Sequence, residues 1–183
     1  MKTIALDFDM AVKTGMTLVK SSEGDSANDA GKMILLGLYT GLRKSDLLKL
    51  SPKNFYELDC EYFVKGAAQK TEKEFEFPIP QYIYNLIVDG ATLPDTIYSK
   101  QRSHIFLNRW MDKVFDYEKN RALTSSGRTI SVHSLRKSFG LRVYNQRGIN
   151  VARQALQHQD TATTSRYLEI ESQQLKEDIK SIW

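Results

Sequence analysis

The sequence predicts a mainly α-helical domain that carries one small antiparallel β-sheet. Apolar residues recur at helical spacing through most of the chain, and an alternating pattern is confined to residues 55–79. The length of 183 residues is about that of one domain, so we expect residues 1–183 to fold together. Hydrophobic residues make up 41% and charged residues 26%, which is close to the average for folded proteins and sufficient for a core.

The first predicted helix covers residues 26–40. It begins with a serine, a favourable N-cap, and continues into a dense apolar cluster. Gly41 ends it, because glycine readily adopts the left-handed conformation that terminates helices. Residues 1–25 are treated as an N-terminal segment. A short second helix is predicted to begin near Ser45 and to end before Pro52.

Residues 55–79 predict a β-hairpin. The first part, residues 55–64, roughly alternates between polar and apolar, and in residues 74–79 apolar side chains share one face while glutamates take the other. Residues 66–71 lie between these two stretches. We therefore expect Lys70 near the tip of the hairpin.

Helices are predicted to resume after Pro80. The clearest contains an apolar stripe spaced i, i+3, i+4, i+7 and i+8, formed by Leu107, Trp110, Met111, Val114 and Phe115. Three further helices are predicted over residues 134–146, 150–157 and 161–168, followed by a tail helix at about 172–181.

Composition excludes several classes of protein. No apolar run approaches the ~18 residues that a membrane-spanning helix needs, so we expect a soluble chain with no membrane partner. Asp7 precedes any long apolar stretch, which argues against a signal peptide. The single cysteine, Cys60, can form no internal disulfide and no cysteine-based zinc site, which favours the reducing cytoplasm.

The formal net charge of +4 is unevenly distributed. Residues 100–153 hold twelve Lys or Arg and three Asp or Glu, whereas the flanking residues 1–99 and 154–183 are net negative. A basic block of this kind is either a solvated face or a nucleic-acid surface, since phosphate neutralisation drives nucleic-acid binding. Charge alone leaves both interpretations open.

Taken singly, five polar residues have ordinary structural explanations. Arg43 follows a helix-ending glycine and would be a surface or capping residue, and Lys70 would be a turn lysine. His133 would be a helix cap or a surface residue. His158 would be a core histidine, and Tyr167 would pack its ring. For each residue alone, the structural explanation is favoured.

Together, these residues occur in an ordered set of motifs. The motifs are Thr40-Gly41-Leu42-Arg43-Lys44-Ser45-Asp46-Leu47, His133-Ser134-Leu135-Arg136, Leu156-Gln157-His158 and Thr163-Thr164-Ser165-Arg166-Tyr167. From His133 onward the key positions are separated by three, twenty-two and nine residues, ending at Tyr167. The set resembles the catalytic domain of the tyrosine recombinase (phage integrase) family, over residues 26–170. The stretch around Lys70 resembles the one that carries the lysine of the family.

The resemblance implies an enzyme that cleaves and rejoins DNA strands. Tyr167 would attack the scissile phosphate and form a 3′-phosphotyrosyl link, leaving a free 5′-hydroxyl. Arg43 and Arg136 would bind the phosphate; arginine suits this task because its planar fork binds two phosphate oxygens and keeps its charge. Since the covalent link conserves the energy of the broken bond, no cofactor and no metal is implied.

The remaining roles of the family fall on four other residues. A tyrosine with a pKa of ~10 is a poor nucleophile at neutral pH, so proton removal must help it. The resemblance assigns this task to His133 as general base, and assigns to His158 a hydrogen bond to the phosphate. Lys70 would be the general acid that protonates the departing 5′-oxygen. Asp46 is expected to orient Arg43 rather than to react.

The implied partner is double-stranded DNA, on which the full-length enzyme would self-associate as a tetramer. Family members clamp DNA between this domain and a preceding core-binding domain, which we expect to be absent from this chain. The chain is then either a fragment of a longer recombinase, which we favour, or a naturally short member of the family. In both cases we expect it to bind DNA weakly and in a salt-sensitive way. Residues 171–183 would form a tail helix that covers the domain's own core or docks on a neighbouring protomer.

Two alternatives to the recombinase stay open: a type IB topoisomerase that relaxes DNA, and a catalytically silent DNA-binding module derived from an integrase. One residue also departs from the pattern of the family. Gln157 stands where the family usually has glycine. If this position needs a positive φ, glutamine would cost ~1 kcal/mol or more and would affect the placement of His158.

Overall fold

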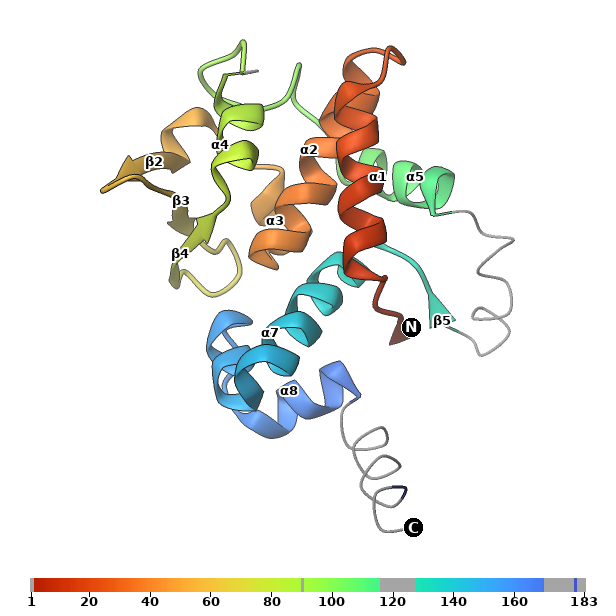
Figure 1. The fold of residues 1–183 in the computed structure, drawn as a ribbon, viewed down its shortest axis with the longest axis vertical. Helices are drawn as coiled ribbons and strands as arrows, with labels where there is room; N and C mark the ends of the chain where they lie inside the picture. Colours follow the sequence, from red (N-terminus) through yellow and green to blue (C-terminus); the bar gives the residue numbers. More distant parts are fainter. Residues whose placement is uncertain (1, 90, 116–127, 170–179, 181–183) are drawn as a thin grey trace.

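The computed structural model describes residues 2–89, 91–115, 128–169 and 180, and these form a mainly helical fold (Figure 1). The elements in chain order are β1 (Lys2–Thr3), α1 (Phe8–Lys20), α2 (Asp25–Thr40), α3 (Lys44–Leu47), the 3₁₀ turn η1 (Pro52–Asn54), β2 (Phe55–Leu58), β3 (Glu61–Ala67), β4 (Glu74–Ile79), α4 (Gln81–Val88), α5 (His104–Val114), β5 (Arg128–Thr129), α7 (Val132–Ala155) and α8 (Thr161–Leu168). An antiparallel sheet has the strand order β2-β3-β4. The predicted fold class, mainly α with a small antiparallel sheet, is confirmed. The parallel pair β1–β5 was not predicted, because strands of two residues leave no alternating pattern.

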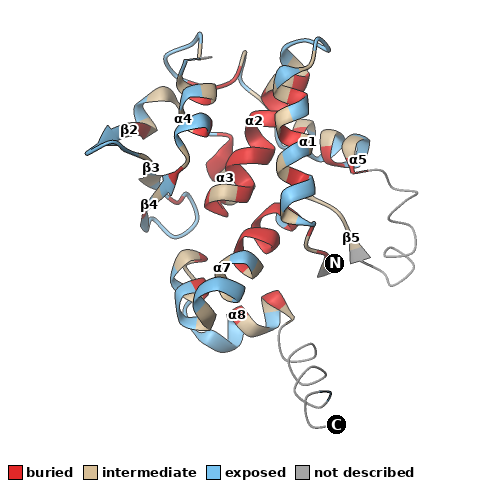
Figure 2. Cartoon of the chain, in the orientation of Figure 1, coloured by how far each residue is buried: buried red, intermediate tan, exposed pale blue. Residues whose placement is uncertain are grey.

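Helix α2 lies at the centre of the fold. Nearly all of its residues from Ala27 to Thr40 are buried, and Figure 2 shows it as an almost continuously buried helix. Most of these residues are apolar or small, as expected of a helix in a core, and the buried charged residues are Asp29 and Lys32. It ends at Gly41 with φ 61°, the left-handed conformation predicted there. It begins at Asp25, one residue before the predicted start.

Residues 1–25, for which no helix was predicted, contain helix α1. Asp7 caps this helix, and its carboxylate accepts a backbone N–H of the first turn at 2.8 Å. The face toward α2 is built partly from the small residues Ala11 and Gly15, so its apolar signal is weak. A Cβ at Gly31 of α2 would lie 2.6 Å from the Gly15 carbonyl oxygen, so the two helices require small residues at this contact.

The antiparallel sheet confirms the predicted hairpin and adds a strand. Residues 55–64 form two strands, β2 and β3, instead of one. They are joined at Asp59 and Cys60, whose φ values of 51° and 63° are typical of a tight hairpin turn. Lys70 lies in the loop of residues 68–73 that connects β3 to β4, as predicted.

Helix α5 confirms the predicted apolar stripe, with Leu107 and Met111 fully buried. The segment that precedes it is fixed to α2 by a buried ion pair. Arg102 Nη2 lies 2.6 Å from Asp29 Oδ2, and the two side chains are 6% and 1% exposed. Asp29 also accepts the Ser99 backbone N–H, so this pair holds α2 against the chain that leads into α5.

Helix α7 carries the His133–Arg136 motif, leads into the Leu156–His158 motif directly after its last residue, and bends within its length. The two helices predicted for residues 134–157 form one element that is interrupted at Gly148, where φ 79° and ψ 178° are not helical. Its N-cap is Ser131, which forms a capping box with Ser134, so the helix starts before the predicted residue. Helix α8 has the predicted bounds.

A small apolar cluster joins α7 to α8. Its buried members are Phe139, Ala152, Leu156 and Leu168. A Cβ at Gly140 would lie 2.8 Å from Leu156 and 2.9 Å from Leu168, so this glycine lets α8 approach α7 closely. The position of α8 is therefore fixed by packing along α7.

Two further predictions concern membrane-spanning helices and the C-terminal tail. Within the residues described, no helix is long and apolar enough to cross a membrane. The tail helix predicted for residues 172–181 lies outside the described residues, apart from Lys180.

Candidate active site

The end of α2 is shaped so that the chain can turn toward α7. Thr40 is fully buried, and its hydroxyl donates to the Leu36 carbonyl and accepts the Leu42 N–H. Gly41 follows in the left-handed conformation, where a Cβ would lie 2.3 Å from the Phe139 ring. Both the backbone conformation and the space therefore require glycine, which explains the Thr-Gly-Leu spacing before the first arginine.

Arg136 connects this turn to the segment between α7 and α8. It is buried, with Nη1 donating to the Gly41 carbonyl and Nη2 to the Leu156 carbonyl, both at 2.5 Å. Burial lowers the pKa of Arg136 to about 10, so it stays charged at neutral pH. A guanidinium has five N–H groups, so this one holds two parts of the backbone and keeps donors for an anion.

Arg43 stands directly before α3 and is partly exposed. Within the described part of the chain its side chain has no hydrogen-bond or ion-pair partner. Its charge acts on the same groups as that of Arg136. Burial, and then the two guanidinium charges, lower the pKa of His133 and His158, and the same charges oppose the rise that burial causes in the pKa of Tyr167. Two neighbouring cations create a local field that favours a phosphate or a similar ligand.

His158 is held by a buried threonine. Its Nδ1 lies 3.1 Å from the hydroxyl of Thr164, which itself donates to the Asp160 carbonyl. The hydroxyl therefore accepts from Nδ1–H, which leaves Nε2 with a lone pair in the neutral ring. Burial, and then the charges of Arg136 and Arg43, lower the pKa of His158 to about 4, so the ring is neutral at pH 7.

His133 lies in the first turn of α7, where its backbone N–H donates to the Ser131 hydroxyl. Partial desolvation of its ring, and then the charges of Arg136, Lys44 and Arg43, lower the pKa of His133 below its usual value. A neutral imidazole at pH 7 can accept a proton, which is the state that a general base needs.

Tyr167 lies beside both histidines. Its hydroxyl donates to the His133 carbonyl oxygen at 3.3 Å, and its ring packs edge-on against the His158 ring at 5.3 Å between centroids. Burial raises the pKa of Tyr167 to about 12, although the charges of Arg136 and Arg43 oppose this rise. The phenol is therefore protonated at rest, and a base is required before it can act as a nucleophile.

Lys70 is the predicted site residue that stands apart. It is exposed, and none of its contacts reaches the other five residues within the described part of the chain. Its loop is well defined, because Ala68 N–H donates to the Lys73 carbonyl at 2.9 Å and Glu72 N–H to the Ala68 carbonyl at 2.8 Å. The loop thus holds the lysine at the surface of the hairpin.

Asp46 bonds to the loop that carries Lys70. Its Oδ1 accepts the Gln69 N–H at 2.9 Å, while Oδ2 is buried without a hydrogen-bond partner among the described residues. It forms neither a hydrogen bond nor an ion pair with Arg43, the residue that it was expected to orient. The carboxylate instead connects α3 with the residue next to Lys70.

Sequence reasoning missed two groups that support the site. Thr164 was part of a quoted motif but had no assigned role, although it fixes the ring of His158. Lys137 is buried, and its Nζ bonds Glu169 Oε1 at 3.0 Å and the Thr3 carbonyl at 3.1 Å. A lysine next to Arg136 reads as a surface residue in the sequence, so only the fold reveals this contact at the end of α8.

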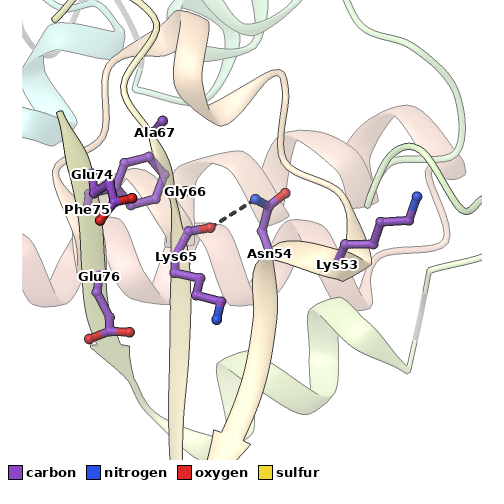
Figure 3. Close-up of a pocket in the computed structure, with 8 residues that line it drawn as sticks. All are labelled: Lys53, Asn54, Lys65, Gly66, Ala67, Glu74, Phe75 and Glu76. Atoms are coloured by element: carbon purple, nitrogen blue, oxygen red, sulfur yellow. Dashed lines mark hydrogen bonds between the residues drawn. The ribbon is translucent and has the colours of Figure 1, made fainter. Parts of the chain in front are cut away.

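Two further features lie outside this cluster. A hollow of about 640 Å³ on the antiparallel sheet is bordered by Lys53, Lys65, Glu74 and Glu76, whose charges balance (Figure 3). It contains none of the predicted site residues. In the described part of the chain, no group of three or more His, Cys, Asp or Glu side chains is placed to hold a metal ion.

On this helical scaffold, two guanidinium groups can stabilise negative charge on a phosphoryl group, and two neutral imidazoles and a phenol lie beside them. The comparison with protein families then identifies the chain. A model of the phage integrase family matches residues 12–174, which is most of the sequence, so the chain belongs to the phage integrase family. The suspected family is thereby confirmed.

Solved structures of recombinases have the same fold. The XerH site-specific recombinase bound to a palindromic difH substrate matches with a TM-score of 0.72 and 18% identity, over 98% of this chain and 53% of that chain. XerA recombinase matches with a TM-score of 0.68 and 19% identity, over 99% and 65%. The Tn1549 transposon integrase in complex with circular intermediate DNA matches with a TM-score of 0.62 and 14% identity, over 90% and 62%.

This chain thus spans about half to two thirds of the length of these recombinases. No curated protein matches it in sequence.

Proposed function

We propose that this chain is the catalytic domain of a site-specific DNA recombinase, which cleaves and rejoins DNA strands through Tyr167. The observation that supports this most strongly is the convergence of Arg43, Arg136, His133, His158 and Tyr167 from three separate parts of the fold. Arg43 and Tyr167 are 124 positions apart in the sequence, and the charge of Arg43 reaches Tyr167 because α7 packs against both α2 and α8.

The proposed reaction begins at the phenol. The Tyr167 oxygen attacks the phosphorus, the bond from phosphorus to the 5′-oxygen breaks, and a 3′-phosphotyrosyl link forms. His133 takes the phenol proton, and Lys70 supplies a proton to the departing 5′-oxygen. Rejoining is the reverse: a 5′-hydroxyl attacks the phosphotyrosine and releases Tyr167.

The two arginines stabilise the transition state. Negative charge builds on the non-bridging oxygens during the attack, and fixed cations need no rearrangement to meet it. If each guanidinium acts as a preorganised donor, its loss costs about 3–4 kcal/mol in the transition state. Arg136 is fixed by its two backbone carbonyls, whereas Arg43 has no side-chain partner among the described residues and is free to turn toward a phosphate.

The proposed partner is double-stranded DNA, on which the full-length enzyme would self-associate as a tetramer. The structure of the XerH recombinase contains its difH substrate, and a lambda integrase structure is a dimer bound to a core site. We propose that this chain alone binds DNA weakly, because its basic block provides mainly phosphate contacts. Such binding falls steeply as salt is raised from 50 to 200 mM, which fluorescence anisotropy would measure. Nanomolar affinity at physiological salt would contradict this proposal.

A covalent-trapping experiment tests the proposed activity. The protein is incubated with nicked duplexes of randomised sequence around the nick, and adducts are isolated on a denaturing gel and sequenced. We expect an adduct with the wild type, none with Tyr167→Phe, and an undiminished yield with Tyr82→Phe, an exposed tyrosine outside the cluster. DNA binding without any adduct supports the silent module, and relaxation of supercoils without a preferred sequence supports the topoisomerase.

A further inference from the structure

We propose that Gln157 is a positioning residue that holds the Lys70 loop against the segment that carries His158. This inference rests on the proposed function, because it assigns Lys70 as the general acid. The contact is a hydrogen bond from Gln157 Nε2 to the Glu74 carbonyl oxygen, at 3.1 Å.

Gln157 adopts a backbone conformation that is unfavourable for a residue with a side chain. Its φ is 53°, in the left-handed region that glycine adopts more readily than any other residue. Glycine would therefore fit this turn with less strain. A glutamine here is explained by what its side chain reaches, and the side chain reaches the hairpin.

The point of contact closes the loop that carries Lys70. Glu74 is the first residue of β4 and pairs with Ala67, the last residue of β3. Everything between them is the loop of residues 68–73. Gln157 therefore holds the hairpin at the base of this loop, while Asp46 holds the loop from the side of α3 through the Gln69 N–H.

Three consecutive residues thus connect three parts of the site. The Leu156 carbonyl accepts from Arg136, the Gln157 side chain donates to the hairpin, and the His158 ring bonds to Thr164 in α8. A hollow of about 380 Å³ lies between β4 and the end of α7, and Gln157 is one of its walls. The glutamine amide therefore spans the space between the general-acid loop and the groups that bind the phosphate.

The hydrogen bond from Gln157 to Glu74 affects the position of the proton donor, Lys70, more than the positions of the residues that bind the phosphate. A general acid works only within hydrogen-bond reach of the leaving oxygen, and small misplacements are costly. Arg136 and His158 keep their own partners when the amide is removed. The loop would lose its attachment at Glu74 and keep the one at Gln69, so Lys70 would spend less time near the leaving oxygen.

The variants Gln157→Gly and Gln157→Glu test this role. Glycine removes the amide and relieves the backbone, so misfolding is not expected, and an ionised glutamate of equal length has no N–H to donate. The substrate is a duplex recovered in the trapping experiment. It is made once with an ordinary phosphodiester and once with sulfur in place of the departing 5′-oxygen, since a thiolate leaves without a proton.

We expect both variants to cleave the ordinary duplex about tenfold more slowly, which is part of the ~10²–10⁴-fold that a positioned acid provides. Both should cleave the sulfur duplex at the wild-type rate. Lys70→Ala should show the same rescue with a larger defect. Equal slowing on both duplexes, or no slowing on either, would overturn the proposal.

Hydrogen exchange separates this inference from the proposed function. If Gln157 holds the loop, amide exchange in residues 68–73 is faster in Gln157→Gly than in the wild type, while exchange in α2 is unchanged. If the wild type forms no adduct with any duplex, the proposed function fails and the loop attachment is decided by exchange alone. Unchanged exchange in residues 68–73 refutes the attachment whatever the activity.

Discussion

Arg136 Nη2 donates to the carbonyl oxygen of Leu156, two residues before His158. The arginine that we assign to the phosphate therefore also fixes the backbone that carries the second histidine. Its Nη1 bonds the Gly41 carbonyl, two residues before Arg43. The buried guanidinium of Arg136 thus helps to position both His158 and Arg43, which are proposed to bind the same phosphate.

The first prediction follows from these two bonds. A lysine in Arg136→Lys keeps the charge but reaches at most one of the two carbonyls. The other would be buried without a donor, which costs about 1–3 kcal/mol in unfolding free energy. Urea denaturation measures this loss. Adduct formation should fall by at least ~10²-fold, because lysine lacks the planar guanidinium that binds two phosphate oxygens.

Arg142→Lys is the matched control for this variant. Arg142 lies on the same helix, but its side chain is 44% exposed and its ion-pair distance to Asp9 is 3.5 Å. We expect its unfolding free energy to stay within about 0.5 kcal/mol of the wild type. An equal loss in the two variants would mean that the carbonyl contacts of Arg136 contribute nothing specific.

The second prediction compares two glycines with positive φ. At Gly41 the φ is 61° and a new Cβ would lie 2.3 Å from the Phe139 ring, so Gly41→Ala combines strain with a steric clash. At Gly24 the φ is 88° but nothing lies within 4 Å, so Gly24→Ala adds strain alone. We expect a loss of about 1 kcal/mol for Gly24→Ala and at least ~2 kcal/mol more for Gly41→Ala. Chemical denaturation measures both losses of unfolding free energy. Equal losses in the two variants would show that the contact with the Phe139 ring does not destabilise Gly41→Ala.

The conformation of Gly41 illustrates which parts of the fold could be predicted from the sequence. A glycine after an apolar helix predicts a left-handed terminus from local physics alone, and α2 has that end. The alternating stretch before Pro80 predicted the hairpin for a similar reason. Helix α1 was missed because small residues such as Gly15 form its contact face, and small residues carry little apolar signal.

For the site, motif order predicted five residues that the fold brings together, but spacing could not predict the contacts of the segments around them. The Asp46 contact with the Gln69 N–H and the Lys137 contact with Glu169 join segments that are 23 and 32 positions apart. Such pairs depend on how helices and loops dock. No local pattern records them, since each residue alone has an ordinary explanation.

The third prediction concerns pH. Burial, and then the charges of Arg136 and Arg43, lower the pKa of His158 in the folded protein to about 4, from a usual value of 6.5. Between these pH values the unfolded chain binds more protons than the folded one. Folding stability therefore falls as the pH is lowered from 6.5 toward 4, and His133, whose pKa is also lowered, acts in the same direction.

Urea denaturation at several pH values from 7 to 4 measures this slope, and His158→Gln should make it shallower. An anion beside the arginines offsets their charge and favours the protonated ring, so inorganic phosphate should bind with proton uptake. Calorimetry in two buffers of different ionisation enthalpy detects that uptake. A stability that rises as the pH is lowered would contradict the assigned direction.

The fourth prediction concerns the attachment of α8, which carries the proposed nucleophile, Tyr167. Lys137 Nζ lies 3.0 Å from Glu169 Oε1, and the side chains are 6% and 21% exposed. Because the pair is largely buried, removal of one partner leaves the other charge poorly solvated. We expect Lys137→Met to lower the unfolding free energy by about 2–4 kcal/mol, and adduct formation to fall because the end of α8 is no longer held.

A double-mutant cycle with Glu169→Gln isolates the pair from the separate bond of Lys137 to the Thr3 carbonyl. We expect a coupling energy above ~1 kcal/mol. The ion pair between Lys113 and Glu23 has a similar distance of 3.1 Å, but its side chains are 61% and 58% exposed. Solvent screening should leave that cycle with little coupling. If the two cycles give the same value, burial does not strengthen the Lys137 contact, and α8 is held by its apolar packing on α7.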